Sequence, residues 1–533
     1  MRQPKVHVQV EGPGSRVWTW LKGRPDHKPL LIFAGLIMFV LIARMDTPQS
    51  MIDLLNQPNP QGYEKLAPNT TILDHLQKIF HEPELTADDA AEKMELLIAS
   101  LAVAIFFWAT AAIPIGATAF LLAALMYIFQ VEPVSVIAKS YMQDAVFFII
   151  GALSLAVGVE ETGLDKRIGL LFLGRTKSRL SYIFLFGTLA AIVSAFISAK
   201  MLIAFLMPIL MKVYKKLVRT NGQEHNRSLA VFLILTVVYM TAMGASGAPS
   251  SGARNALMVG FFNDYGKPMT YFQWMKYGMP MVPFGILIAG VYLLFAFRKL
   301  DVKIDPGTIV KEETAKLGRF GLREGTMAGI ILAVIIMWIF AGDTLELGGP
   351  IIIGIVLMFI TGIIEWDTLR RNVAWGVVWM YAAACGIGFS LKVTGAGLWL
   401  ATAAFNIFPS SMLHSEGLLI TCSIITGVIT NFMSAGASVA VVAPITLPMA
   451  AMAKLDIWQI GLATAFASTF GHCLIIGRPG LAIAYALGRD PETGERLITV
   501  GDLLLYGIPL LVIVWIYMAV WVFYGYWHWM SFS

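Results

Sequence analysis

Three basic residues stand inside stretches of sequence that are otherwise apolar. Lys200 is the single charged residue of 181–211, and Arg254 and Arg478 lie in two later apolar stretches. A lysine at the centre of an apolar helix costs about 2.5 to 3.5 kcal/mol on membrane-insertion scales, so its presence needs a reason. Binding of an anion is one reason. Alternatively, Lys200 reaches an interface or pairs with an acidic neighbour, and the two arginines hydrogen-bond loose backbone carbonyls.

The composition places these cations in a membrane protein. The chain has 533 residues, of which 57% are hydrophobic and 14% charged, and its mean hydropathy is +0.71. These values exclude a soluble enzyme or a nucleic-acid-binding protein as the first interpretation. The net charge of +5 comes from Lys and Arg between apolar stretches, where a membrane protein keeps its cytoplasmic loops. No cluster of nucleophile, base and acid and no metal motif indicates an enzyme, and no cofactor is expected.

Apolar stretches that can cross the membrane, or nearly so, recur along the chain. They are 29–43, 94–113, 118–130, 145–159, 181–211, 229–263, 277–297, 325–341, 350–364, 373–390, 417–453, 457–488 and 503–526. The first follows a basic N-terminal segment without a small-residue cleavage site, so it is predicted to be a retained span. The next segment, 44–93, is strongly acidic and is predicted to lie outside, which places the N-terminus inside.

The stretch 181–211 is predicted to be a re-entrant hairpin with its tip near Ser198. Basic clusters flank it on both sides, and a single crossing would put one of them on the wrong side of the membrane. Its 31 residues suit two short helices better than one helix of about 46 Å.

The second half of the chain repeats this plan with the opposite orientation. The uncharged stretch 417–453 has little positive charge at its flanks, as expected of a hairpin that opens to the outside. Ser198 stands ten residues before Pro208, and Ser434 stands ten residues before Pro444. An apolar helix interrupted by small residues follows each hairpin, at Gly244–Asn255 and at Gly471–Gly480, and Thr162-Gly163 is echoed by Thr394-Gly395. Such inverted repeats indicate a secondary transporter with its site at mid-membrane.

At these residues the chain resembles the divalent anion/sodium symporter family, the carriers of dicarboxylates, citrate and sulfate. The resemblance extends from about residue 29 to the end and rests on the hairpin tips and interrupted helices. It implies an all-α polytopic membrane protein of about 11 transmembrane helices plus two re-entrant hairpins, working as an elevator-type homodimer. It also implies a cytoplasmic N-terminus and an extracytoplasmic C-terminus, and we expect the bacterial inner membrane.

The resemblance assigns the site residues by position. The substrate-binding residues it implies are Ser198, Ala199, Lys200, Gly252, Arg254, Ser434, Ala435, Gly436, Gly477 and Arg478. The ion-binding residues it implies are Ser194, Ser198, Ser251, Thr430, Met433 and Ile476, with the second tip preceded by the family-like Thr430-Asn431-Phe432.

Both tips depart from the family, in which they read Ser-Asn-Thr. Ala199 and Ala435 replace the two Asn residues, and Lys200 replaces the adjacent Thr. Loss of both amides weakens the inference of sodium coupling. Our hypothesis is that Lys200 acts as a tethered cation in place of the first sodium ion.

The expected domains follow from the same resemblance. They are a cytoplasmic segment 1–28, a scaffold part 29–165 with the outside loop 44–93, a transport part 180–297 with hairpin 181–211 and broken helix 229–263, a cytoplasmic loop 298–324, a second scaffold part 325–395, and a second transport part 417–526 with hairpin 417–453 and broken helix 457–488.

The expected function is secondary active transport of small divalent anions, dicarboxylates first and sulfate-like oxyanions second. The alternative is a transport-inactive membrane sensor or structural partner, suggested by the double loss of Asn. Proton or exchange coupling stays open: His472 could carry a proton, although a buried histidine satisfied by backbone is the favoured interpretation. Cys385, Cys422 and Cys473 are predicted to be buried, inert thiols.

Overall fold

The chain folds entirely into helices. The computed structural model describes residues 23–24, 27–61, 63, 69–196, 199–220, 226–300, 304, 306–409 and 412–532, which contain isolated bridges but no strand. Within these ranges nine helices are long and apolar enough to cross a membrane, and six more apolar helices have 10–17 residues. The prediction of an all-α polytopic membrane protein is confirmed.

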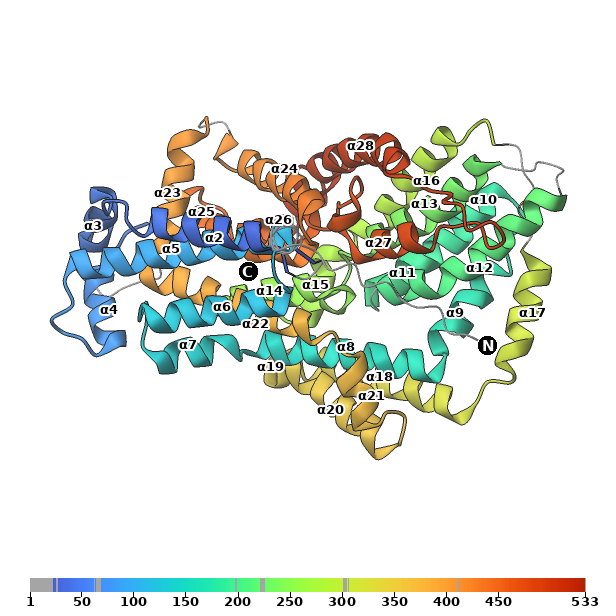
Figure 1. The fold of residues 1–533 in the computed structure, drawn as a ribbon, viewed down its shortest axis with the longest axis horizontal. Helices are drawn as coiled ribbons and strands as arrows, with labels where there is room; N and C mark the ends of the chain where they lie inside the picture. Colours follow the sequence, from blue (N-terminus) through green and yellow to red (C-terminus); the bar gives the residue numbers. More distant parts are fainter. Residues whose placement is uncertain are drawn as a thin grey trace, which may run out of the picture.

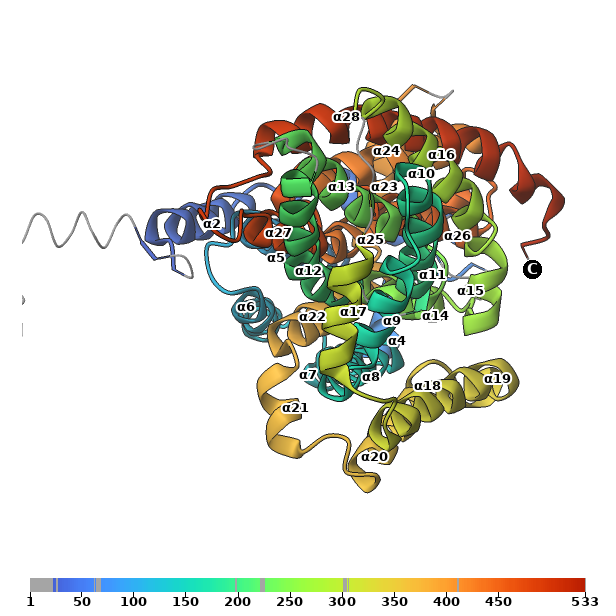
Figure 2. The same cartoon turned by 90° about the vertical axis from the view of Figure 1, so that its right-hand side faces the viewer.

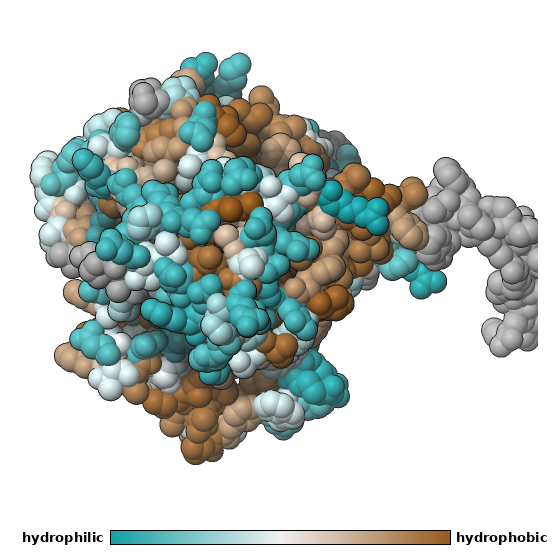
Figure 3. Space-filling view, turned by 90° about the vertical axis from the view of Figure 1, so that its left-hand side faces the viewer, coloured by the Kyte–Doolittle hydropathy of each residue, from teal (hydrophilic) through white to brown (hydrophobic). Residues whose placement is uncertain are grey.

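The helices run mainly along the long axis of the molecule (Figure 1). The acidic segment forms α3 (Gln49–Asn56) and α4 (Ile72–Phe80) at one end, and α17 (Gly307–Leu317) lies at the other. Seen from the α3–α4 end, hydrophilic residues gather over the end face and hydrophobic residues surround it (Figure 3). This distribution suits helices that cross a bilayer along the long axis.

One part of the molecule pairs helices from the two halves of the chain. α8 (Asp144–Thr162) packs against α20 (Gly348–Ile360), and α6 (Ile115–Ile128) packs against α22 (Trp375–Thr394). Figure 2 shows α18, α20 and α21 together along the lower edge of the molecule. The other helices of this part are α2 (Pro29–Ile42), α5 (Ala87–Thr110), α7 (Val134–Tyr141), α18 (Leu322–Phe340), α19 (Gly342–Leu345) and α21 (Trp366–Asn372).

The other part contains two pairs of helices, each followed by an interrupted helix. In the first repeat these are α10 (Arg179–Ser181), a π-helical turn η1 (Tyr182–Gly187), α11 (Thr188–Phe196), α12 (Ala199–Thr220), α13 (Arg227–Gly244) and α14 (Ala253–Asp264). In the second they are α24 (Glu416–Phe432), α25 (Ala435–Met452), α26 (Ile457–Ala467) and α27 (Pro479–Leu487). The predicted interruptions are therefore confirmed as breaks between α13 and α14 and between α26 and α27.

The two repeats interlock at these breaks. The first arm of each hairpin packs against its own interrupted helix, α11 on α13 and α24 on α26. The second arm packs against the interrupted helix of the other repeat, α12 on α27 and α25 on α14. Each break therefore lies beside elements of both repeats.

Both ends of the first hairpin reach the same connecting segment. The Arg179 guanidinium donates to the carbonyls of Phe297 and Leu300 at 2.7 and 2.8 Å, and Lys212 Nζ lies 2.8 Å from Glu313 Oε1. Because α16 (Met281–Ala296) leads through this segment into α17, the hairpin begins and ends at one end of the molecule, as predicted.

The repeats also agree in register. Pro208 is nine residues beyond the start of α12, and Pro444 is nine residues beyond the start of α25. α8 ends at Gly163 and α22 at Gly395, both in the left-handed region with φ of +74° and +80°. Glycine adopts this conformation without a Cβ penalty, which explains the repeated Thr-Gly at two helix ends.

Two helices extend beyond the apolar stretches that predicted them. α5 begins at Ala87 rather than 94 because Thr86 and Asp89 form a capping box, in which the Asp89 amide donates to Thr86 Oγ1 at 3.2 Å. α12 continues past 211 to Thr220, since its lysines find acidic partners; Lys215 Nζ lies 3.1 Å from Asp490 Oδ2. Apolar length alone missed both extensions.

The remaining helices connect or close these parts. α16 packs against α28 near the end of the chain. All three cysteines are buried, as predicted. The other elements are α9 (Leu164–Leu173), α15 (Tyr271–Gly278), α23 (Ala396–Ile407), α28 (Val500–Tyr517), η5 (Met518–Phe523) and η6 (Tyr526–Trp529).

Candidate functional site

The first break is closed by side chains that follow it in the sequence. Ala245 O accepts from Arg254 Nη2 at 2.6 Å, from Asn255 Nδ2 at 3.2 Å and from the Ser251 hydroxyl. Ala248 O accepts from Ser251 Oγ and Asn255 Nδ2, both at 2.9 Å. A helix that stops inside an apolar environment leaves carbonyls without partners, and these three side chains supply them. Arg254 therefore has the structural role that was one of its two predicted roles.

The hydrogen bond to the neutral Ala245 carbonyl does not neutralise the positive charge of the Arg254 guanidinium. Its Nε is buried and has no hydrogen-bond partner in the described part of the chain. Its Nη1 lies over Gly252, where an added Cβ would stand 2.3 Å from that nitrogen. The end of the Arg254 side chain thus occupies the space beside Gly252.

The second break is closed from the neighbouring hairpin instead. Asn431, near the end of α24, accepts from the Cys473 amide at 2.8 Å through Oδ1 and donates to Phe470 O at 3.3 Å through Nδ2. Thr430 Oγ1 donates to Ser468 O at 3.0 Å. Asn431 and Thr430 together replace the backbone bonds that α26 loses where it stops.

Arg478 begins α27 at this second break, and its side chain is buried. Its Nη1 lies 3.4 Å from Val238 O, and its residue is 8% exposed. The contact with Val238 joins Arg478 to α13, the helix that ends at the first break, so Arg478 lies beside the break that Arg254 closes. Among the described residues neither guanidinium has a carboxylate partner. The structure therefore brings together two of the three predicted cations, with no counterion.

The tip of the second hairpin lies in the same region. Ser434 is the N-cap of α25, and its Oγ accepts from the Ala437 amide at 3.3 Å. Ala435 is 8% exposed, and Gly436 comes so close to α22 that an added Cβ would stand 2.0 Å from the hydroxyl oxygen of Tyr381. Tyr381 also interacts electrostatically with Arg254. The tip thus places the positive end of a helix near Arg254.

The tip of the first hairpin is a different environment. Ser198 lies outside the described residues, and Ala199, which begins α12, is 8% exposed. Lys200 is exposed and lines an open cavity of about 330 Å³ together with Glu160, Asp165 and Lys166. Arg254 and Arg478 are not among the described residues that line this cavity. Lys200 therefore lines a cavity that neither of the two arginines lines.

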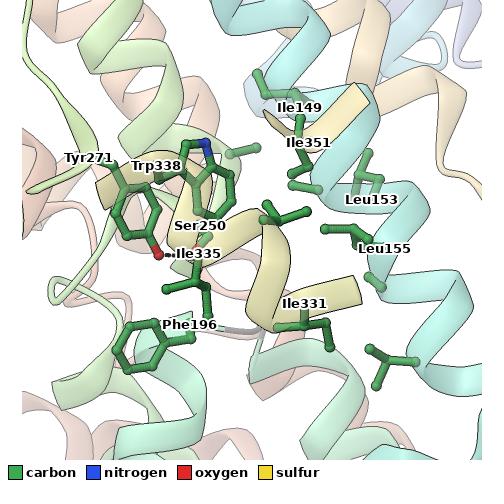
Figure 4. A pocket seen from close by; sticks show the side chains of 16 residues that line it. Ile149, Leu153, Leu155, Phe196, Ser250, Tyr271, Ile331, Ile335, Trp338 and Ile351 are labelled. Carbon is green, nitrogen blue, oxygen red and sulfur yellow. Dashed lines mark hydrogen bonds between the residues drawn. The ribbon is translucent and has the colours of Figure 1, made fainter. Parts of the chain in front are cut away.

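A smaller apolar cavity of about 90 Å³ adjoins the open one (Figure 4). Leu153 and Ala156 of α8 line both cavities, and the smaller cavity extends to Gly252 at the first break. Its wall includes Tyr271, which is hydrogen-bonded to Ser250 at 2.7 Å and stacked on Trp338 with ring centroids 4.3 Å apart. The two cavities therefore share part of their wall on α8, and the smaller one reaches the first interrupted helix.

The predicted ion-binding residues occupy equivalent places in the two repeats. Ser194 Oγ donates to Thr241 O at 2.9 Å just as Thr430 Oγ1 donates to Ser468 O, and each hydroxyl stands four residues before its tip serine. A hydroxyl that donates its proton keeps lone pairs for a cation. Of the others, Ser251 serves the first break, Met433 ends α24, and Ile476 lies in the turn η4 (Ile475–Gly477). Gly477 packs so closely that an added Cβ would stand 2.6 Å from Thr430 O.

His472 is fully buried, but the prediction of a backbone-satisfied ring is wrong. Neither ring nitrogen has a hydrogen-bond partner in the part of the chain that the structure describes. Its ring instead meets Tyr239 edge to face, with centroids 5.3 Å apart. The His472 imidazole lies at the same break as Arg478, and the positive charge of Arg478 acts on the imidazole.

Comparison with known proteins agrees with this architecture. Residues 84–533 match the family model described as the sodium:sulfate symporter transmembrane region. A membrane protein of Cupriavidus necator is 25% identical over 82% of this chain and 87% of its own length. The sodium-dependent high-affinity dicarboxylate transporter 3 of Caenorhabditis elegans is 23% identical over 77% of this chain and 80% of its own length.

A solved structure gives the same fold. MtrF of Neisseria gonorrhoeae, described as illuminating a class of antimetabolite efflux pumps, aligns with a TM-score of 0.56 and 14% identity over 96% of this chain and 98% of its own. Because the identity is low, this likeness concerns the fold alone. With the family model matched over most of its length, the chain belongs to the sodium:sulfate symporters, the divalent anion/sodium symporter family.

Proposed function

We propose that the protein is a secondary active transporter of small divalent anions, with dicarboxylates as the first candidate substrates and sulfate-like oxyanions as the second. The observation that carries this proposal is the pair of arginines at the two helix breaks. Arg478 is buried and Arg254 is partly buried, and neither has a carboxylate partner among the described residues. A buried cation without a counterion is costly, and two that repel each other are more so. An anion with two charges relieves both at once.

The relatives support a dicarboxylate first. The Caenorhabditis elegans relative is named a sodium-dependent high-affinity dicarboxylate transporter, whereas the family model takes its name from sulfate. Both are small divalent anions, which matches the two guanidinium groups. The start of α25, with Ser434 as its N-cap, adds the positive end of a helix beside these groups.

For coupling, we propose that Lys200 takes the place of the first sodium ion. It belongs to the first hairpin, where the family has Thr, and it is exposed to the open cavity. The second repeat keeps Thr430 together with the backbone near Met433 and Ile476, so one sodium site at most remains. Sodium dependence should accordingly be reduced or absent.

The wider arrangement is part of the same proposal. The helices paired around α8 and α22 form a scaffold, and the two hairpins with their interrupted helices form a transport part that moves as an elevator within a homodimer. We place the protein in the bacterial inner membrane with the N-terminus in the cytoplasm and the C-terminus outside. The basic end of the molecule, which carries Arg179 and Lys212, would then face the cytoplasm.

Counterflow in proteoliposomes tests the function. Vesicles loaded with succinate should accumulate labelled succinate, and sulfate should compete, with or without sodium. Binding of the anion without exchange of label would contradict transport and favour the anion-binding sensor. Strict sodium dependence with two or more ions per anion would contradict the role of Lys200.

Two lysine variants refine the coupling test. Lys200→Thr restores the residue that the family has at this position, so uptake should gain sodium dependence. Lys166→Thr removes the other lysine of the same open cavity and is the matched control, with an unchanged response to sodium. An equal response of both variants would indicate a general effect of cavity charge and would contradict the tethered-cation role.

A further inference from the structure

Tyr381 stands where the two parts of the molecule meet. It lies on α22, which packs against α6 and α7 on one side and against α14 and α25 on the other. Its side chain is 5% exposed. The phenol is therefore held between the first interrupted helix and the tip of the second hairpin.

The Tyr381 hydroxyl reaches into the first turn of α25. An added Cβ at Gly436 would stand 2.0 Å from the hydroxyl oxygen and 2.6 Å from the ring carbon that carries it. No real Cβ makes such contacts with a ring that is packed on all sides, so only glycine at position 436 permits this approach. The glycine of the tip thus has a physical reason in this structure, which is to admit the phenol oxygen.

This hydroxyl differs from those of two other buried tyrosines. Tyr182 donates to Leu233 O at 2.9 Å and Tyr526 donates to Tyr277 O at 2.6 Å. Tyr381 makes no hydrogen bond within the described part of the chain, and the charge that acts on its oxygen is that of Arg254. A hydroxyl without a partner in the protein is available to donate to a ligand, and a hydrogen bond from it to a charged group would stabilise the bound ligand.

We propose that Tyr381 is an anion-binding residue, whose hydroxyl donates a hydrogen bond to an oxygen of the divalent anion held by Arg254 beside Gly436. This inference rests on the proposed function and adds a neutral donor from α22 to the two guanidinium groups. The donor favours an anion with an oxygen acceptor on this side, as carboxylates and sulfate both have. Because α22 belongs to the proposed scaffold, the anion is touched by both parts of the molecule in this conformation.

The test compares two tyrosine variants by titration calorimetry of the full chain in detergent, with succinate and sulfate as probes. Tyr381→Phe keeps the ring and removes only the hydroxyl, and should raise Kd for the better ligand about tenfold, the effect of one hydrogen bond to a charged group. Tyr141→Phe is the matched control, because its ring packs on Gly386 of the same helix and its hydroxyl serves Ala119. Its Kd should equal that of the wild type.

The possible results of this titration distinguish the role of Tyr381 from the proposed transport function. If the wild type binds a divalent anion and Tyr381→Phe binds it equally well, Tyr381 is not part of the site, while the proposed function stands. If the wild type binds no divalent anion, the proposed function fails first. Gly436→Ala gives a second measurement should Tyr381→Phe be poorly folded, because the added methyl must displace the hydroxyl and should weaken binding in the same way. Unchanged affinity in Gly436→Ala would also overturn the proposal.

Discussion

The two interrupted helices solve the same problem in different ways. In the first repeat the loose carbonyls of the break are served from within, by Ser251, Arg254 and Asn255. In the second they are served from the hairpin, by Thr430 and Asn431. The first break also takes a bond from outside, since Trp274 Nε1 donates to Ser246 O at 3.0 Å, but most of its bonds come from its own side chains. At the second break, the Ser468 carbonyl and the Cys473 amide are served by the hairpin.

The two breaks also differ in how their arginines are held. Arg254 belongs to the network that closes its break, while Arg478 makes a single longer contact of 3.4 Å to Val238. The two hairpin tips differ as well. Lys200 of the first tip lines an open, charged cavity, whereas Gly436 of the second tip packs against the Tyr381 hydroxyl. A duplicated architecture thus carries two unequal halves of one site, and an anion that needs both must bridge them.

The largest expected effect comes from removing Asn431. Asn431→Ala leaves the Cys473 amide without a partner inside the protein and removes one of the two donors to the Phe470 carbonyl, which keeps the His472 amide. The variant should lower the free energy of unfolding by about 2 to 3 kcal/mol. Asn255→Ala should cost less, because Arg254 and Ser251 still serve the carbonyls of the first break. Thermal unfolding in detergent compares the two variants. Equal losses would contradict the distinction between a break held mainly by its own side chains and one held by the hairpin.

A pH effect is expected at the open cavity of the first repeat. Burial raises the pKa of Asp165 from 3.8 to about 6, an effect opposed by a backbone hydrogen bond at Lys166 and the charge of Lys166. Since the folded state holds this proton more tightly, its contribution to stability is full below pH 3.8 and is lost as the pH rises through 6, by at most about 3 kcal/mol.

The measurement is the melting temperature from pH 4 to pH 8. The wild type should lose stability between pH 4 and 7, and Asp165→Asn should remove this part of the slope. Glu161→Gln, at the end of α8, is the control and should leave the slope in place. A slope that survives in Asp165→Asn would mean that another group titrates.

The smallest expected effect concerns the two equivalent hydroxyls. Ser194→Ala and Thr430→Val each remove one bond to a buried carbonyl and should cost about 1 to 2 kcal/mol. Their responses to sodium should differ: stabilisation by sodium, where the wild type shows it, should vanish in Thr430→Val and persist in Ser194→Ala. Persistence in Thr430→Val with loss in Ser194→Ala would place the sodium site in the first repeat and contradict the role of Lys200.

Much of this architecture could be predicted from the sequence because it depends on local signals. The echoes of Thr-Gly and of Ser with Pro ten residues later mark helix ends and starts, and the small-residue stretches mark the breaks. The capping residues Thr86 and Asp89 also mark the early start of α5 in the sequence, but the apolar stretch itself begins only at residue 94.

The site itself could be predicted only in part, because tertiary packing decides it. Arg254 and Arg478 stood out as charges in apolar sequence, and the structure brings them together. Nothing around Tyr381 in a small-residue helix marks it as a neighbour of Gly436, since that contact joins residues 55 positions apart. Likewise, the sequence could not place Lys200, which lines the open cavity, or assign Asn431 to the second break.

The central claim is that Arg254 and Arg478 together bind one divalent anion, and calorimetric titration with succinate and sulfate tests it most directly. Arg254→Gln keeps a donor for Ala245, and Arg478→Gln keeps one for Val238, so each variant removes the charge with little change of structure. Each should weaken binding more than tenfold, whereas Arg227→Gln, at the exposed start of α13, should bind like the wild type. Full affinity in either Arg254→Gln or Arg478→Gln would contradict this claim.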